Sequence, residues 1–568
     1  MSARPFPWER NYPQGLSWDI EIPRETIPAM LANTIARHGA EPALEYRGHE
    51  ISFVQLGVAI DEVAKGLIAL GLRPGERVAL YLPNSPGHPF SFFGTLSAGL
   101  VVAHLSPLDA ERELVHKLRD SGARVLVCTN LGAMLAMAIR LLEGGHVDRL
   151  IVGDDAQFGP IPGMAHPPIP QDDPRIMTIP ALRALGRGAD VVLPAIDPDG
   201  LALLQYTGGT TGLPKGAMHT HATLRASVAI YATFFDGQGR FPPGERFRAI
   251  CVLPLFHIYA LVVLLLLQLS RGSMLMLRLK FDPETTLRDI EVNRASYFPG
   301  VPTMWIALAN VPDLDRRDLS SLKLVGSGGA PLPVEIGLRF ERLTGMRLGG
   351  GWGMTETASA GTGNLLDGVF KHGSAGMPLP GVKLDVVALD DPTCVLPYGE
   401  TGEIRIKSPN LFKGYWKNPE ENERSFVDGH FLTGDVGYID QDGLVFLVDR
   451  KKDMIISGGF NVYPTQIEQA IYEHPAVAEV IVVGVPDEYR GQSAKAFVTL
   501  KVGAASFGID ELRGFLADKL GRHEMPVAME IRESLPKTSV GKFSRKELAA
   551  EAAADHRKQA MGSGVAHG

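Results

Sequence analysis

Cysteine, basic charge and long apolar runs are all scarce in this chain of 568 residues. Its 3 cysteines, Cys128, Cys251 and Cys394, are widely spaced, which gives neither a disulfide framework nor a zinc-ligand spacing and fits a reducing cytoplasm. Lys and Arg number 56 against 64 Asp and Glu, a net charge of -8. This balance lacks the basic excess of nucleic-acid binders, so we expect no nucleic-acid partner.

No segment has the length of a membrane span. The most apolar stretch, residues 259–267, is far shorter than the ~20 residues that a spanning helix needs, so we predict a buried core helix there. The first residues, MSARPFPWERNYPQG, lack the apolar centre of a signal peptide. We therefore expect a cytoplasmic protein without integral membrane contact. Weak peripheral contact with a membrane stays open, as does the oligomeric state, for which a homodimer is one option.

The 45% of hydrophobic residues is enough to build large cores. Between residues 43 and 128, short apolar runs alternate with helical periods, which predicts a mostly parallel sheet covered on both faces. Ser52 and Gln55 match a capping box at the start of one helix, and Asp109 is expected to cap another. Residues 154–200 are rich in proline and glycine, and we expect a long irregular connection there.

The same alternation resumes at residue 201, and residues 382–407 indicate a β-rich subdomain. The charged cluster DRKKD (residues 449–453) marks a domain boundary. We predict an α/β fold in which a large N-terminal region of βα-layered subdomains and a small β-rich subdomain (1–451) precede a small mobile C-terminal α+β domain (452–550). The tail, 551–568, is expected to be a short helix followed by a disordered segment.

The strongest local motif is YTGGTTGLPKG (residues 206–216), directly after the apolar run LALLQ. Glycines let a backbone approach an anion closely, and hydroxyl groups and a lysine add donors for phosphate oxygens. The motif is not a Walker A loop, because Leu-Pro separates its last lysine from the preceding glycine. The predicted phosphate cradle consists of Thr207, Gly208, Gly209, Thr210, Thr211, Gly212 and Lys215.

Further motifs follow in a fixed order: GSGGAPL (326–332), GWGMTE (351–356), FLTGDVGYID (431–440), LVDRKKDMIISGGF (447–460) and PKTSVGKFSR (536–545). With the phosphate loop, they resemble the adenylate-forming superfamily, and in particular its acyl-CoA synthetase branch, which includes medium- and long-chain fatty acid–CoA ligases. The resemblance extends over residues 30–548. It implies ATP (with AMP as product), Mg²⁺ and coenzyme A as cofactors.

The resemblance also implies residue roles. Thr355 would touch the phosphate, Glu356 would bind Mg²⁺, and Trp352 would pack on the adenine, where relatives more often carry Tyr. Lys542 would be the catalytic lysine, and His257 would shape the acyl pocket and the path of the thiol. The remaining implied residues are the adenine neighbours Gly328, Ala330 and Pro331, the ribose ligands Asp435 and Arg450, the hinge residue Lys452, and Gly458 and Gly459, which a domain rotation brings beside CoA.

The predicted reaction is ATP-dependent activation of a carboxylic acid to acyl-AMP, with pyrophosphate release, followed by acyl transfer to CoA. The predicted acyl-pocket segments are aromatic and aliphatic, which favours a medium- to long-chain fatty acid. An aromatic or dicarboxylic acid–CoA ligase and a carrier-protein acyl-AMP ligase remain alternatives, as do a luciferase-like monooxygenase and a non-catalytic nucleotide binder. Basic residues in the last part of the chain favour CoA over a carrier protein: Lys451, Arg490 and Lys495.

Overall fold

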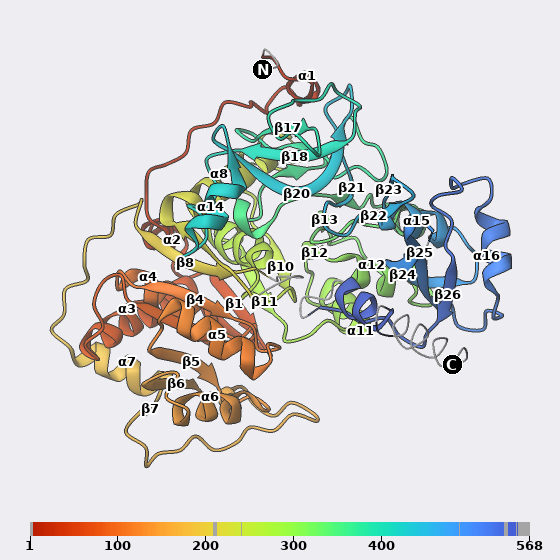
Figure 1. Ribbon diagram of the computed structural model, residues 1–568. Helices are drawn as coiled ribbons and strands as arrows, with labels where there is room; N and C mark the ends of the chain where they lie inside the picture. Colours follow the sequence, from red (N-terminus) through yellow and green to blue (C-terminus); the bar gives the residue numbers. More distant parts are fainter. Residues whose placement is uncertain are drawn as a thin grey trace.

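The computed structural model describes residues 4–207, 213–239, 241–242, 244–487, 489–538, 543–552 and 554. In these residues, two mostly parallel sheets lie beneath an antiparallel sheet in the view of Figure 1, and a separate C-terminal sheet lies at the right in blue. This arrangement confirms the predicted α/β class with a large N-terminal region and a smaller C-terminal domain. Across the described ranges, no helix is both long and apolar enough to cross a membrane.

The first sheet contains the β/α alternation predicted near the N-terminus. Its neighbouring strands are parallel except for the last pair, which is an antiparallel hairpin. The strand order is β7 (Ile176–Thr178), β6 (Arg149–Gly153), β5 (Val125–Thr129), β3 (Arg77–Tyr81), β4 (Val101–Leu105), β8 (Leu201–Tyr206) and β9 (Gly216–Thr220). The phosphate-loop motif joins β8 to β9, so the loop begins at the carboxyl end of a buried strand.

The expectation of an irregular connection over residues 154–200 is wrong in part. This segment contains β7, which extends the first sheet at its edge, and the amphipathic helix α7 (Ile179–Gly188). The helix packs closely on α3 (Phe53–Ala69), where the carbonyl oxygen of Glu62 would lie 1.9 Å from a Cβ atom at Gly186. The high proline content obscured these short elements, because Pro180 occupies the first turn of α7, where proline is tolerated.

Two helix starts were predicted, with different outcomes. Ser52 and Gln55 form the predicted capping box of α3, and each side chain accepts a hydrogen bond from the other residue's backbone N–H. Asp109 does not cap α5 (Glu111–Ser121), because the residue before that helix is Ala110. The Asp109 carboxylate instead accepts from the backbone N–H of Ser106 and pairs with Lys117 at 2.5 Å.

The second sheet is built in the same way, with parallel neighbours apart from one edge hairpin. Its strand order is β14 (Gly349–Gly350), β13 (Leu324–Ser327), β12 (Tyr297–Gly300), β10 (Arg248–Cys251), β11 (Met274–Leu277), β1 (Pro42–Tyr46) and β2 (His49–Ser52). Besides α3, α5 and α7, the helices before β9 are α1 (Pro7–Asn11), α2 (Ile27–His38), α4 (Gly87–Ser97) and α6 (Met134–Glu143). Four helices after β9 are α8 (His221–Asp236), α11 (Pro283–Glu291), α12 (Pro302–Ala309) and α13 (Val334–Thr344).

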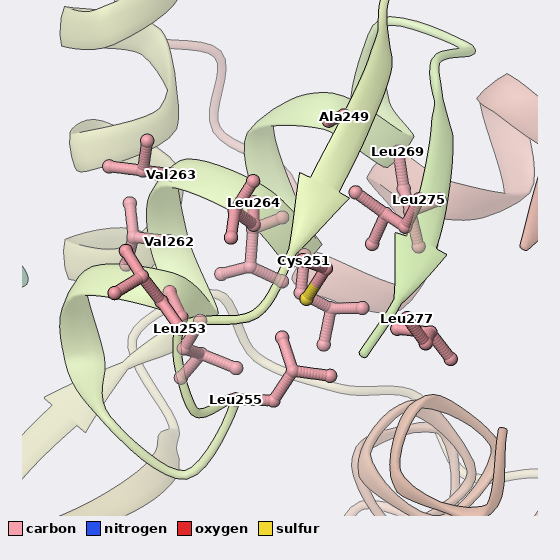
Figure 2. Packing of buried hydrophobic residues seen from close by; sticks show 14 of the residues in the cluster. Ala249, Cys251, Leu253, Leu255, Val262, Val263, Leu264, Leu269, Leu275 and Leu277 are labelled. Carbon is pink, nitrogen blue, oxygen red and sulfur yellow. The ribbon is translucent and has the colours of Figure 1, made fainter. Parts of the chain in front are cut away.

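The predicted apolar helix at residues 259–267 is buried and irregular. It starts as α9 (Ile258–Ala260), continues as a π-helix (Leu261–Leu266) and ends as α10 (Leu267–Ser270). Figure 2 shows Leu264 beside Cys251 of β10 and Val262 near Leu253 of the loop after β10, and all four residues belong to the same buried cluster.

The β-rich subdomain is an antiparallel sheet of β17 (Lys383–Val387), β18 (Gly402–Lys407), β20 (His430–Ile439), β19 (Phe426–Val427) and β21 (Val445–Arg450). Next to it are the helix α14 (Pro419–Ser425) and a two-stranded sheet of β15 (Thr362–Gly363) and β16 (Met377–Pro378). The C-terminal sheet begins five residues later and contains β23 (Phe460–Val462), β22 (Ile455–Ser457), β25 (Gly491–Leu500), β24 (Val477–Asp487) and β26 (Ala528–Ile531), flanked by α15 (Pro464–Tyr472) and α16 (Ile509–Leu516). In the predicted tail, residues 551 and 552 are helical, and all the rest except residue 554 lies outside the described residues.

Candidate active site

The phosphate loop is held at both ends. The backbone N–H of Thr207, just after β8, donates to the carbonyl oxygen of Lys215 at 3.0 Å. The Lys215 ammonium forms an ion pair of 2.6 Å with Glu421 of α14 and lies 4.4 Å from the ring centroid of Tyr415. The other predicted members of the cradle, Gly208, Gly209, Thr210, Thr211 and Gly212, lie outside the described residues.

Tyr415 links this lysine to the predicted magnesium ligand. Its hydroxyl donates to Oε1 of Glu356 at 2.7 Å, and the Glu356 side chain is buried. Burial raises the pKa of Glu356, while the hydrogen bond from Tyr415 opposes that rise. Sequence analysis did not select Tyr415. The signal that could have found it is the Gly-Tyr-Trp run followed by Asn-Pro at residues 414–419, a turn directly before a helix.

Thr355 is positioned through its backbone. The Nε2 atom of His219, in β9, lies 2.8 Å from the Thr355 carbonyl oxygen. Burial lowers the pKa of His219 to about 4, so the ring is neutral at pH 7 and Nε2 carries the donated proton. The strand β9, which follows the phosphate loop, therefore fixes the segment that contains Glu356.

Trp352, Asp435 and Arg450 meet although they come from three separate motifs. The indole N–H of Trp352 donates to Oδ2 of Asp435 at 2.7 Å, and Arg450 contacts Oδ1 at 2.9 Å. Asp435 and Arg450 are directly opposite each other on β20 and β21. The ring of Trp352 also lies against Gly361, where a Cβ atom would be only 2.6 Å from a ring carbon. The predicted adenine and ribose residues are thus brought together.

The predicted adenine neighbours follow the carboxyl end of β13. Gly328 donates its backbone N–H to the carbonyl oxygen of Gly300, and a Cβ atom at Gly328 would lie 2.8 Å from the ring of Tyr259. Ala330 is half-buried and Pro331 is exposed. The ring of Tyr259, which lies in the predicted acyl pocket and is called the acyl wall below, therefore touches the segment that is predicted to line the adenine.

His257 is the residue immediately before α9. Its Nδ1 accepts the backbone N–H of Tyr259 at 3.3 Å, and its side chain is half-buried. Tyr297, at the start of β12, is buried, and burial followed by the neighbouring phenols of Tyr259 and Tyr231 raises the pKa of its hydroxyl. Trp305, in α12, is fully buried and packs in the core beside Phe298 and Phe340.

The predicted hinge and CoA residues lie in and just before the C-terminal sheet. Lys452 is exposed as a residue, and desolvation of its ammonium group, followed by the charge of Arg450, lowers its pKa. Gly458 and Gly459 form the two-residue turn between β22 and β23, with φ values of 60° and 86° that favour glycine. Two of the basic residues expected to favour CoA are already paired with carboxylates: Lys451 with Glu403 at 2.8 Å and Lys495 with Glu530 at 2.9 Å.

Lys542 lies outside the described residues, but the chain on both sides of it is placed. Lys537 and Phe543 pair across an antiparallel bridge, which closes the loop between them. The guanidinium of Arg545 reaches Asp449 at 3.2 Å and Glu468 at 2.6 Å. Because Asp449 precedes Arg450, the Arg545 side chain is held next to the strand that carries Arg450.

The residues present fit a magnesium ion that is shared with a nucleotide. Throughout the described residues, no group of three or more His, Cys, Asp or Glu side chains is arranged to hold a metal ion. Magnesium usually binds one or two carboxylates and takes its other ligands from substrate phosphates and water. Glu356 supplies one such carboxylate, buried and with one oxygen already oriented by Tyr415.

Comparison with known proteins agrees with this geometry. Residues 31–416 match the family model of the AMP-binding enzymes, and residues 466–542 match the AMP-binding enzyme C-terminal domain. A long-chain-fatty-acid–CoA ligase of Bacillus subtilis is 36% identical over 97% of this chain and 99% of its own, and one of Escherichia coli O6:H1 is 34% identical over 96% and 98%.

Solved structures show the same fold. The ATP-bound MatB of Rhodopseudomonas palustris has a TM-score of 0.81 at 29% identity and covers 93% of this chain and 99% of its own. An anthranilate CoA ligase in complex with anthranoyl-AMP has a TM-score of 0.82 at 25% identity, over 95% and 99% of the two chains. With its motifs assembled around one site and both family models matched, the chain belongs to the AMP-binding enzymes.

Proposed function

We propose that this protein is an ATP-dependent fatty acid–CoA ligase. The observation that carries the proposal is the convergence of two chains of contacts: Lys215, Tyr415 and Glu356 on the phosphate side, and Trp352, Asp435 and Arg450 on the nucleoside side. The full-length similarity to curated long-chain-fatty-acid–CoA ligases supports the choice of acid and thiol.

The reaction has two steps. In the first, a carboxylate oxygen of the acid attacks the α-phosphorus of ATP, and the bond from that phosphorus to the pyrophosphate oxygen breaks. In the second, the sulfur of CoA attacks the acyl carbonyl carbon, and the bond to AMP breaks. The thiol proton is released to solvent. Acyl-CoA, AMP and pyrophosphate are therefore the products.

Each part of the site has a task in this scheme. Asp435, oriented by Arg450, accepts hydrogen bonds from the ribose hydroxyls, and the Lys215 ammonium stabilises negative charge on the phosphates. Glu356 would hold Mg²⁺, which when bound neutralises charge on the phosphate oxygens. Lys542 is proposed to stabilise the charge that develops between the carboxylate and the α-phosphate during adenylation.

The acid is proposed to be a medium- to long-chain fatty acid. The ring of Tyr259 covers Gly328, and the buried, wholly apolar π-helix begins two residues after Tyr259, which suits an apolar chain. An aromatic acid is the second candidate, because a feruloyl-CoA synthase of Amycolatopsis sp is 35% identical over 94% of this chain. A cytoplasmic location, which rests on the cysteine content, and a homodimeric state both stay predictions.

Pyrophosphate release with ATP and Mg²⁺ across a panel of acids, each with and without CoA, tests the proposal. The panel spans short to long fatty acids, benzoates, hydroxycinnamates, dicarboxylates and amino acids. We expect CoA-dependent turnover that peaks on a fatty acid of medium or long chain. A peak on an aromatic or dicarboxylic acid would show that the enzyme activates that class of acid and not fatty acids. Adenylation without acyl transfer to CoA would indicate a carrier protein, and ATP binding without turnover a non-catalytic protein.

A further inference from the structure

The loop between β10 and α9, residues 252–257, is fastened by an asparagine from the other large sheet. Asn84 lies just after β3 and is only 3% exposed. Its Nδ2 donates to the carbonyl oxygens of Cys251 and Leu253, each at 2.9 Å, and its Oδ1 accepts the N–H of Leu255 at 2.8 Å. One buried amide thus satisfies two backbone groups of this loop and one at the end of β10.

A second buried amide holds the end of the same loop. Gln205 in β8 donates from Nε2 to the Phe256 carbonyl oxygen at 2.8 Å, and its Oε1 lies 2.9 Å from Nδ1 of His104 in β4. Because a carbonyl needs a donor, the amide can take only this orientation, and Nδ1 of His104 must carry the proton. Burial lowers the pKa of His104 to about 4, which keeps its ring neutral at pH 7.

The loop needs these partners because it is buried among apolar side chains. Leu253 is 3% exposed and Leu255 is fully buried, and Figure 2 shows Leu253 beside the π-helix and Leu255 between that helix and β11. Backbone groups in such a setting cost free energy unless they are paired. The loop also leads directly into His257, whose ring caps the N–H of Tyr259, and the ring of Tyr259 covers Gly328. A displacement of the loop would therefore move the acyl wall.

Gln205 also connects this wall to the nucleotide side. It stands two residues before Thr207, whose N–H is bonded to Lys215 across the phosphate loop. We propose that Asn84 and Gln205, with His104 behind Gln205, are positioning residues that set the acyl wall and so decide which acid the enzyme accepts. This inference rests on the proposed function and adds to it the residues that select the substrate.

A matched control exists elsewhere in the first sheet. Asn130 follows β5 and is likewise 3% exposed. Its Nδ2 donates to Asp154 at 2.8 Å and to the carbonyl oxygen of Pro167, and its Oδ1 accepts the N–H of Asp155. It holds a loop that lies outside the candidate site. Asn84→Ser and Asn130→Ser therefore remove the same chemistry from equally buried positions.

The experiment compares Asn84→Ser, Gln205→Met and Asn130→Ser by kinetics on the acid panel and by equilibrium unfolding. We expect the first two variants to raise KM for the preferred acid about tenfold and to flatten the chain-length preference, with KM for ATP within twofold of wild type. Asn130→Ser is expected to lose stability and keep both KM values. The proposal would be overturned if Asn130→Ser raised KM for the acid as much as Asn84→Ser and Gln205→Met do. It would also be overturned if those two variants raised KM for ATP as much as KM for the acid.

A second pair of variants covers the case in which the first two fail to fold. His104→Asn keeps a donor for Gln205, whereas His104→Leu removes it. We expect His104→Leu to shift KM for the acid and His104→Asn to restore most of the wild-type value. Identical kinetics in the two variants would overturn the positioning role but would leave the proposed function untouched. A wild-type enzyme that is inactive on every acid would overturn the proposed function, and this inference with it.

Discussion

Trp352 donates its indole N–H to Asp435 over 2.7 Å, so the residue predicted to pack on the adenine also orients the carboxylate predicted to bind the ribose. A tyrosine, which the resemblance led us to regard as more common here, has no ring N–H in this position. Arg450 holds the other carboxylate oxygen, which leaves Asp435 fixed from two directions. The nucleoside side of the site is therefore preorganised by partners that come from separate parts of the chain.

Removing the indole donor is expected to weaken nucleotide binding. Trp352→Phe keeps a ring but deletes the hydrogen bond to a charged group, which is worth about 1.5–3 kcal/mol. We expect KM for ATP to rise roughly tenfold, since 1.4 kcal/mol is a factor of about ten, while KM for the acid changes little. Steady-state kinetics with each substrate varied in turn would measure both constants. An unchanged KM for ATP would show that the bond has no part in binding.

The ion pair between Lys215 and Glu421 is expected to compete with ATP. Both side chains are about one-third exposed, at 34% and 35%, so the pair contributes little to stability. Glu421→Gln should free the ammonium for the phosphates and lower KM for ATP by roughly two- to fivefold. Lys215→Met should raise KM for ATP. Both variants can be assayed by pyrophosphate release. If both raised KM for ATP, Glu421 would not compete with ATP for Lys215.

Lys542 is predicted to act in adenylation only. Lys542→Ala should abolish acyl-AMP formation, because no other positive charge is assigned to the carboxylate and α-phosphate. Thioester formation from supplied acyl-AMP and CoA should largely survive, since the scheme gives this lysine no role in that step. Both half-reactions can be followed separately by chromatography of AMP, acyl-AMP and acyl-CoA. Equal loss of the two would contradict the assignment.

Stability is expected to fall in mild acid because of three buried histidines outside the nucleotide side of the site. Burial lowers the pKa of His104 and of His221 to about 4, and that of His88 well below 6.5. Below pH 6.5 the unfolded chain takes up protons that the folded protein does not bind, so the stability present above pH 6.5 is lost towards pH 4. At pH 5 the shifts of His104 and His221 should each lower the free energy of unfolding by about 1–2 kcal/mol.

Denaturant unfolding at pH 7.5, 6.5, 5.5 and 4.5 would measure this loss. His104→Asn removes one of these buried histidines while it keeps a donor for Gln205, so the stability of the variant should depend less steeply on pH. If wild type and variant had parallel pH profiles, His104 would not contribute to the loss.

The sequence by itself determined the class of fold and the family. The fold class follows from the alternation of apolar and helical segments, because parallel strands need a helical crossover between them. The family follows from motifs such as the phosphate loop and GWGMTE, each of which is confined to a few consecutive residues. Local patterns failed at two places. The proline content of residues 154–200 obscured the helix α7. The Asp109 carboxylate, which was expected to cap a helix, instead binds Lys117 and the backbone N–H of Ser106.

Only the tertiary structure decided which side chains meet. Tyr415 joins Glu356 from a turn 59 residues later in the chain, and Asn84 binds the Leu253 carbonyl group from 169 residues away. Such contacts have no local periodicity or cap to announce them. They arise because folding brings the carboxyl ends of strands from two sheets together and buries polar groups that must find partners there.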